Sequence, residues 1–232
     1  MIKAVFFDID DTLFTFEKAH AAAMPSLCRY AWEQLGIDPE AFAFAYNDQY
    51  RRMAEEIGPQ AAIHNRMIRF LRILKENGKP LSFAPVLNDL YWNAVLAAGG
   101  PEPGAPECIR SLRQKGYILG VASNMTLDWQ MRKLETIGVL PYFHCIVTSE
   151  EAGTEKPDKR FFDLCIRYAG CRPEECLMVG DSLELDILGA ENAGMHALWY
   201  AEPDKLTAHP GFSHYSQLED RIAALDYCPL FS

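Results

Sequence analysis

The sequence lacks an excess of positive charge. Its 232 residues include 22 Lys and Arg against 32 Asp and Glu, which gives a formal net charge of −10. A protein that binds nucleic acid needs basic side chains to neutralise the backbone phosphates. This composition therefore argues against nucleic acid as a partner and favours a small molecule.

Long apolar runs are also missing. Before Asp8 the chain offers only the run Ala4 to Phe7, which is too short for the apolar segment of a signal peptide. No stretch approaches the roughly 20 apolar residues that cross a bilayer. We therefore expect a cytoplasmic protein with no membrane partner.

Paired metal-binding cysteines are a third absence. The chain has seven cysteines, an odd number, and no two of them form a C-x-x-C pair. A structural zinc site is therefore not expected. The free thiols are expected to pack as small apolar groups in a reducing compartment.

What the sequence does contain is a series of short β-rich runs. They lie at Ile2 to Phe7, Ile118 to Ala122, Cys145 to Thr148, Cys176 to Val179 and His196 to Tyr200. In the second half of the chain each run is followed by helical periodicity, which is typical of a parallel sheet covered by helices. The sequence predicts an α/β fold with a Rossmann-like parallel sheet.

The long interval between the first two runs has no convincing strand. Four amphipathic helices are expected there instead, at Glu17 to Leu35, Pro39 to Ile57, Gln60 to Asn77 and Phe83 to Ala98. We predict an inserted α-helical cap over residues 15–103, with residues 1–14 and 104–232 forming the α/β core. Its linkers, Phe14 to Phe16 and Gly99 to Gly104, would attach the cap beside Asp8 as a lid.

Acidic residues cluster directly after the first predicted strand. Asp8, Asp10 and Asp11 lie within four consecutive positions. One Asp would suit a turn or a helix cap, but carboxylates this close repel one another unless a cation lies among them. Asp181 and Asp186 follow a later strand in the same way. Together the two clusters offer the oxygen ligands that Mg²⁺ prefers.

Two further polar stretches follow predicted strands. Ser123 and Asn124 end the second strand, and Lys156 precedes a helix. Each alone is an ordinary loop residue. The four stretches taken together resemble the haloacid dehalogenase superfamily of phosphohydrolases, with D-x-D-x-T at Asp8 to Thr12, Ser-Asn, Lys-Pro, and G-D-S-x-x-x-D at Gly180 to Asp186. The position of the insertion resembles that family's helical cap of the first (C1) type.

The resemblance implies a phosphatase that forms an aspartyl phosphate. Asp8 would be the nucleophile, and Asp10 would protonate the leaving oxygen and later deprotonate water. Mg²⁺ would be held by the carboxylates of Asp8 and Asp181 and by the backbone carbonyl of Asp10. Lys156 would pair with Asp8 and with the phosphoryl oxygens.

The resemblance also implies roles for the remaining motif residues. Ser123 and Asn124 would contact phosphate, the latter through its backbone. Thr12 and Asp186 would be supporting residues, and Thr12 is also a candidate for phosphate binding. Asp11, where many members carry Gly, is expected to cap a turn and point away from phosphate. His20 and His64 are expected to pack in the cap.

The sequence leaves alternatives open for both the reaction and the substrate. A phosphomutase or phosphotransferase would share these motifs, whereas a 2-haloacid dehalogenase would lack the second acid, Asp10. The stretch after Asp8 is similar to pyrimidine 5'-nucleotidases, although sugar phosphates suit the same cap type. Phe14 and Phe16, at the expected rim, are the candidates for selecting a nucleoside monophosphate or a sugar phosphate. The expected assembly is a monomer or a homodimer.

Overall fold

A six-stranded parallel sheet forms the centre of the computed structural model, which describes residues 1–207 and 209–227. The strands are β1 (Ala4–Phe7), β2 (Ile118–Ser123), β3 (Cys145–Thr148), β4 (Cys176–Gly180), β5 (His196–Tyr200) and β6 (Gly211–Phe212). Their order across the sheet is β3-β2-β1-β4-β5-β6. The predicted α/β class and parallel sheet are confirmed. The two-residue strand β6 was not predicted, because so short a run carries no periodicity.

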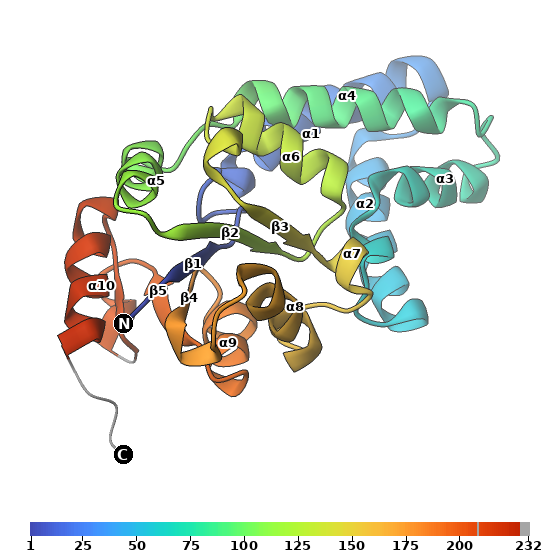
Figure 1. Cartoon of the computed structure of the whole chain (residues 1–232). Helices are drawn as coiled ribbons and strands as arrows, with labels where there is room; N and C mark the ends of the chain where they lie inside the picture. The colour runs from blue at the N-terminus through green and yellow to red at the C-terminus, as the bar shows by residue number, and fades with distance from the viewer. Residues whose placement is uncertain (208, 228–232) are drawn as a thin grey trace.

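Helices cover both faces of this sheet. On one side lie α5 (Ala105–Gln114), α6 (Leu127–Thr136) and α10 (Leu218–Tyr227), and on the other lie α8 (Lys159–Ala169) and α9 (Gly189–Asn192) (Figure 1). Val5 and Phe7 belong to the first apolar core, and Ala4 and Phe6 belong to the second. All four are buried, so β1 is apolar throughout, as expected for a central parallel strand.

Shorter helices complete these layers. They are α7 (Ser149–Ala152), a π-helix at Leu183–Leu188, and 3-10 turns at Ala61–His64, Leu140–Tyr142, Pro173–Glu175, Lys205–Thr207 and Tyr215–Gln217. None of the helices in residues 1–207 and 209–227 has both the length and the apolar character required to cross a bilayer.

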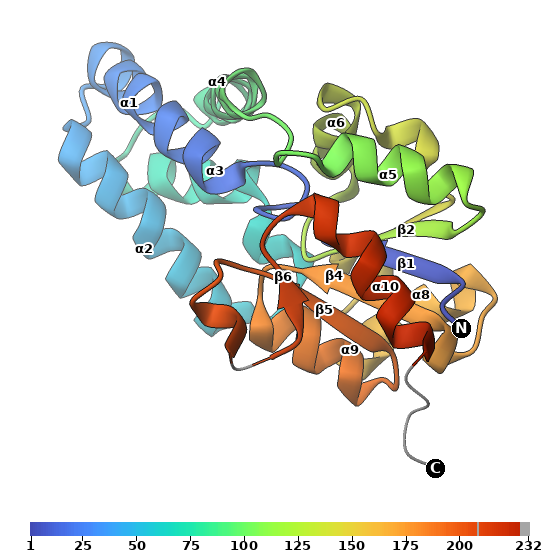
Figure 2. The same ribbon diagram turned by 90° about the vertical axis from the view of Figure 1, so that its left-hand side faces the viewer.

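The interval between β1 and α5 is helical, as predicted. It holds α1 (Phe16–Leu35), α2 (Pro39–Ile57), α3 (Arg66–Glu76) and α4 (Phe83–Ala98), which lie together at one end of the molecule (Figures 1 and 2). The prediction of one continuous helix from Gln60 to Asn77 is wrong. Asn65 is extended, and its side chain accepts a hydrogen bond from the backbone N–H of Ile68 at 3.3 Å. It therefore ends one helical segment and caps the next.

The two linkers of the helical insertion lie side by side. The backbone N–H of Thr15 donates to the Gly100 carbonyl at 3.0 Å, and the Gly100 N–H donates to the Thr15 hydroxyl at 3.1 Å. The Phe14 ring packs so closely on Gly99 that an added Cβ would lie 2.0 Å from it. We propose this pairing as the boundary between a core of residues 1–14 and 104–232 and a cap of residues 15–103. The last five residues of that range, and residue 208, lie outside the described residues.

Candidate active site

The strand order brings Asp8 to the middle of the sheet edge. Phe7, the last residue of β1, pairs with Val121 of β2 on one side and Val179 of β4 on the other. The chain goes to one side of β1 for β2 and β3 and to the other for β4, β5 and β6. Ligands of open parallel sheets bind in the crevice at such a switch point, outside the carboxyl ends of the strands.

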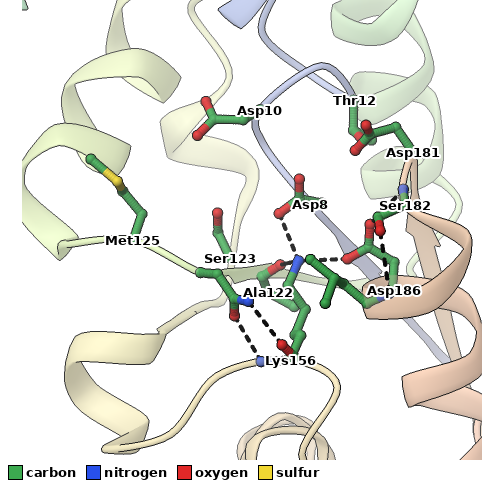
Figure 3. Close-up of polar contacts among 12 residues, drawn as sticks. Asp8, Asp10, Thr12, Ala122, Ser123, Met125, Lys156, Asp181, Ser182 and Asp186 are labelled. Atoms are coloured by element: carbon green, nitrogen blue, oxygen red, sulfur yellow. Dashed lines mark hydrogen bonds and ion pairs between the residues drawn. The ribbon is translucent and has the colours of Figure 1, made fainter. Parts of the chain in front are cut away.

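Lys156 connects two of the acidic residues. Its ammonium group donates hydrogen bonds to Asp8 Oδ1 at 2.8 Å, Asp186 Oδ1 at 2.5 Å and the Ala122 carbonyl at 2.8 Å (Figure 3). Burial alone would favour the neutral amine, but Asp186 and Asp8 outweigh it and raise the pKa of Lys156 above its ordinary value. A positive charge is thus fixed beside Asp8.

Asn124 holds the Lys156 backbone in place. Its side-chain oxygen accepts from the Lys156 N–H at 2.8 Å, and its side-chain nitrogen donates to the Lys156 carbonyl at 3.0 Å. The side chain therefore links the end of β2 to the Lys156 loop. The predicted contact of Asn124 with phosphate through its backbone stays a prediction.

Three carboxylates form a candidate metal site. Oxygen atoms of Asp8, Asp181 and Asp186 all lie within 4.8 Å of one another. Asp186 comes this close because Gly180 has no side chain, and an added Cβ there would lie 2.3 Å from Asp186 Oδ2. Lys156 supplies one positive charge to three carboxylates, so the set fits a hard divalent cation with oxygen ligands.

The electrostatics of the cluster point the same way. Burial raises the pKa of Asp8 to about 7, with further contributions from Asp186 and Asp10 that Lys156 partly offsets. Burial, followed by the negative charges of Asp8 and Asp186, raises the pKa of Asp181 to about 8. Asp181 is exposed, so water screens part of this effect. Carboxylates that hold protons this strongly need a nearby cation to ionise at neutral pH.

Thr12 is fully buried, and its hydroxyl donates to Asp181 Oδ1 at 3.2 Å. This geometry makes Thr12 a support for a candidate metal ligand. Its predicted contact with phosphate stays a prediction. Asp11 adopts a positive φ of 54°, and its carboxylate accepts from the Glu17 N–H at 2.9 Å. This turn fixes the start of α1, in keeping with the expected turn-capping role.

Asp10 lies on the other side of Asp8 from Asp181 (Figure 3). Its carboxylate is 2.5 Å from the ammonium group of Lys133 and accepts a weak bond from Gln130 at 3.4 Å. Gln130 also donates to the Ser123 hydroxyl at 2.6 Å. Helix α6 therefore positions both Asp10 and Ser123.

Sequence reasoning missed Lys133 and Gln130. Both are fully buried, and the Lys133 ammonium group lies 4.4 Å from the centre of the Phe16 ring. Burial lowers the pKa of Lys133, and Asp10 opposes this shift. The one signal in the sequence is their spacing of three positions, which puts both on one helix face. Polar residues on a helix face usually meet solvent, so the spacing alone did not identify them.

Two adjoining cavities share Asp10 and Asn124 in their walls. One, of about 220 Å³, holds the predicted residues Asp8, Ser123, Lys156, Asp181 and Asp186, and the other, of about 310 Å³, extends into the helical insertion. Phe16 lines the second cavity, but Phe14 is fully buried in the linker and is brought to neither. His20 and His64 are also in the wall, where His20 contacts the Tyr91 hydroxyl at 3.0 Å and His64 contacts Glu155 at 3.0 Å.

Several known proteins are similar to this chain in sequence and in architecture. A family model for the haloacid dehalogenase-like hydrolases matches residues 2–194. A ribulose-1,5-bisphosphate 5-phosphatase of Halopiger xanaduensis is 35% identical over 86% of this chain and 85% of its own. A pyrimidine 5'-nucleotidase of Streptococcus pneumoniae is 29% identical over 97% of this chain and 95% of its own. A crystal structure of a 2-haloacid dehalogenase from Pseudomonas syringae pv. Tomato superposes with a TM-score of 0.75 at 26% identity, covering 97% of this chain and 99% of that one.

Proposed function

This chain belongs to the haloacid dehalogenase-like hydrolases, and from that premise we propose that it hydrolyses small phosphate monoesters with Mg²⁺ by way of a phosphoryl group carried on Asp8. It is a phosphatase of that family, in keeping with relatives named as phosphatases and nucleotidases. The observation that carries the proposal is the place of Asp8, between the ammonium group of Lys156 at 2.8 Å and the second acid, Asp10.

The first half of the reaction breaks the ester. A carboxylate oxygen of Asp8 attacks phosphorus, the bond from phosphorus to the leaving oxygen breaks, and Asp10 gives that oxygen a proton. Lys156 and the hydroxyl of Ser123 stabilise the phosphoryl oxygens. Gln130 orients that hydroxyl through its 2.6 Å bond. The product of this half is an alcohol and an aspartyl phosphate.

The second half regenerates the enzyme. Asp10, now a carboxylate, takes a proton from the water that attacks phosphorus, and the bond from phosphorus to Asp8 breaks to release inorganic phosphate. Lys133 lies 2.5 Å from Asp10 and orients its side chain for both halves. The same side chain thus serves first as acid and then as base.

The carboxylates of Asp8 and Asp181, with the backbone carbonyl of Asp10, would hold Mg²⁺. When bound, the ion supplies positive charge that offsets repulsion between the Asp8 carboxylate and an anionic phosphate. Thr12 fixes the Asp181 carboxylate through its hydrogen bond of 3.2 Å. Asp186 accepts a hydrogen bond of 2.5 Å from the Lys156 ammonium group and orients it.

The size of the second cavity supports a small leaving group. Its volume of about 310 Å³ is at the lower end of the range for small-molecule sites. The named relatives act on a sugar bisphosphate and on pyrimidine nucleotides, and both substrate types are small phosphorylated metabolites. We further propose a cytoplasmic location and a monomeric or homodimeric state, which cell fractionation and light scattering would test.

An assay of phosphate release tests the proposed function. With Mg²⁺ we expect turnover of an aryl phosphate and of some members of a panel of sugar phosphates and nucleoside monophosphates. Chelation by EDTA should reduce each rate on the order of 100-fold or more, because the phosphoryl group would then meet uncompensated carboxylates. Equal rates in EDTA would contradict the metal requirement. Halide release from 2-haloacids without phosphate release would identify a dehalogenase instead.

The free energy of unfolding of the metal-free protein should depend on pH through Asp8. Its pKa rises from 3.8 to about 7 on folding, so between these values the folded protein holds a proton that the unfolded chain has lost. In EDTA the Tm should therefore fall as the pH rises from about 4 to about 7, and the stabilisation by Mg²⁺ should grow over the same window. Differential scanning fluorimetry with EDTA or Mg²⁺ measures both trends. Asp8→Asn should make the curve in EDTA shallower, with the remaining slope due to Asp181, whereas the exposed-site control Asp220→Asn should not; a slope unchanged by Asp8→Asn would refute the assignment.

A further inference from the structure

Two buried arginines in the wall of the second cavity have no acidic partner among residues 1–207 and 209–227. Arg66 and Arg69, in the first turn of α3, are 8% and 4% exposed and line the cavity. Over the described part of the chain, no carboxylate oxygen comes within 4.0 Å of either guanidinium group. Less buried arginines of the insertion do form ion pairs, such as Arg72 of α3 with Glu56 at 2.7 Å and Arg52 of α2 with Glu76 at 2.8 Å. The two positive charges of the cavity therefore lie in a buried environment, where an unpaired charge is least favourable.

The contacts that these arginines do make are neutral. Arg66 donates to the His64 carbonyl at 2.6 Å and lies 3.7 Å from the sulfur of Met125, and Arg69 donates to the Ile63 carbonyl at 3.1 Å. Within the part of the chain that the structure describes, the Nε atoms of both arginines and the hydroxyl of Tyr46 have no hydrogen-bond partner. Buried polar groups and charges are normally paired, so these donors indicate a ligand.

Other ionisable groups around the cavity do not cancel this charge. Asp10 is paired with Lys133, and Glu155 is in contact with His64. Burial, followed by the charges of Arg66 and Arg69, lowers the pKa of His20, which keeps its ring neutral at neutral pH. Two guanidinium charges remain uncompensated beside the phosphoryl site.

We propose that this cavity binds a second anionic group, a carboxylate or a phosphate, on the leaving group of the substrate. The inference rests on the proposed function and specifies its substrate class: small phosphate monoesters with an anion at the far end. Because the two cavities share Asp10 and Asn124, one molecule reaches from Asp8 to the arginines. Guanidinium groups bind carboxylate and phosphate through paired hydrogen bonds.

The aromatic lining could suggest a nucleobase, but the structure favours the anion. The Arg69 guanidinium lies 4.6 Å from the centre of the Tyr46 ring and 4.9 Å from that of Tyr50, so it already occupies faces on which a base would stack. Cation–π contacts of this kind orient a guanidinium without neutralising it.

Matched substrates test the inference on the wild-type enzyme. The pairs are 2-phosphoglycolate with 2-hydroxyethyl phosphate, and propane-1,3-diol bisphosphate with its monophosphate, so that the two arms separate a carboxylate from a phosphate as the second anion. We expect kcat/KM at least about 10-fold higher for the doubly anionic member of one pair or both, because hydrogen bonds to charged groups are the strong ones. Equal values within both pairs, or a higher value for a pyrimidine nucleoside monophosphate than for all of these, would overturn the inference.

Variants locate the effect. Arg66→Gln and Arg69→Gln should each reduce the preference for the doubly anionic member about 10-fold, mainly through KM, and Arg69→Lys should restore part of it. Arg72→Gln is the matched control on the same helix and should keep the preference unchanged. A preference that survives both Gln variants would place the second anion elsewhere and refute the inference.

A binding measurement separates failure of this inference from failure of the proposed function. Calorimetry with 3-phosphonopropanoate and 3-hydroxypropylphosphonate, which are not hydrolysed, should give a Kd at least about 10-fold lower for the first. Equal affinities would contradict the anion site even if the enzyme is an active phosphatase. A lower Kd for 3-phosphonopropanoate would support the anion site even if the enzyme releases no phosphate. Absence of phosphate release would refute only the proposed reaction.

Discussion

Replacing Asp8 with Asn is expected to reduce phosphate release by at least about 10⁴-fold, because the amide cannot attack phosphorus. The fold should survive, since the new side chain has the same shape and its oxygen can still accept from Lys156, as Asp8 Oδ1 does at 2.8 Å. Initial rates on an aryl phosphate with Mg²⁺, beside circular dichroism spectra of both proteins, provide the measurement.

A neighbouring carboxylate provides the control for this variant. Asp11→Asn changes the same charge in the same loop, at a side chain that is bonded to the Glu17 backbone and serves the turn. We expect its rate to stay within about 10-fold of wild type. Substantial turnover by purified Asp8→Asn, or an equal loss in both variants, would argue against a covalent intermediate on Asp8.

Asp10→Asn is expected to have the second-largest effect, and one that depends on the leaving group. For an alkyl phosphate the loss should be about 10²- to 10⁴-fold, because a basic alkoxide must be protonated as it leaves. For p-nitrophenyl phosphate the loss in the first half-reaction should be far smaller, since p-nitrophenolate leaves without a proton. Pre-steady-state release of p-nitrophenol isolates that half from the later attack of water.

The comparison of the two leaving groups is its own control, because any damage to the fold or to the metal site would affect both substrates alike. Equal losses for both would show that Asp10 acts through structure and does not transfer the proton. Halide release from 2-chloropropanoate by the wild-type enzyme would also count against this role, since that chemistry needs no acid at Asp10.

The chain order of the motifs was sufficient to predict which edge of the sheet brings the candidate site residues together. Asp8, Ser123 and Asp181 each follow an apolar run, and parallel strands place their carboxyl ends at one edge, so residues far apart in the sequence had to meet there. The family suggested by these motifs is confirmed by the family model, and the fold class is confirmed by the parallel sheet. The exact role of Thr12 was not accessible, because its hydroxyl could turn to phosphate or to Asp181 from the same backbone position.

The cap side of the site could be predicted only as far as its helices. Periodicity identified their apolar faces but gave no sign of how each helix would be rotated against the core. Lys133, Arg66 and Arg69 all belong to sequences that predict a solvated polar face, and tertiary packing buries them. Phe14, expected at the rim, is fully buried because its ring packs in the space that Gly99 leaves by having no side chain.

The adjacent linkers have a mechanical consequence. Since Thr15 and Gly100 are hydrogen bonded to each other, the two chain connections between the insertion and the core lie side by side. This pairing keeps the two connections together, and a rotation of the insertion about them would have to break its other contacts with the core, such as Trp92 with Trp129 and His64 with Glu155. Such a rotation would change the distance from α3 to the end of β1 while leaving the carboxylate cluster intact. A substrate bound at both ends would then set the angle between the insertion and the core by its own length.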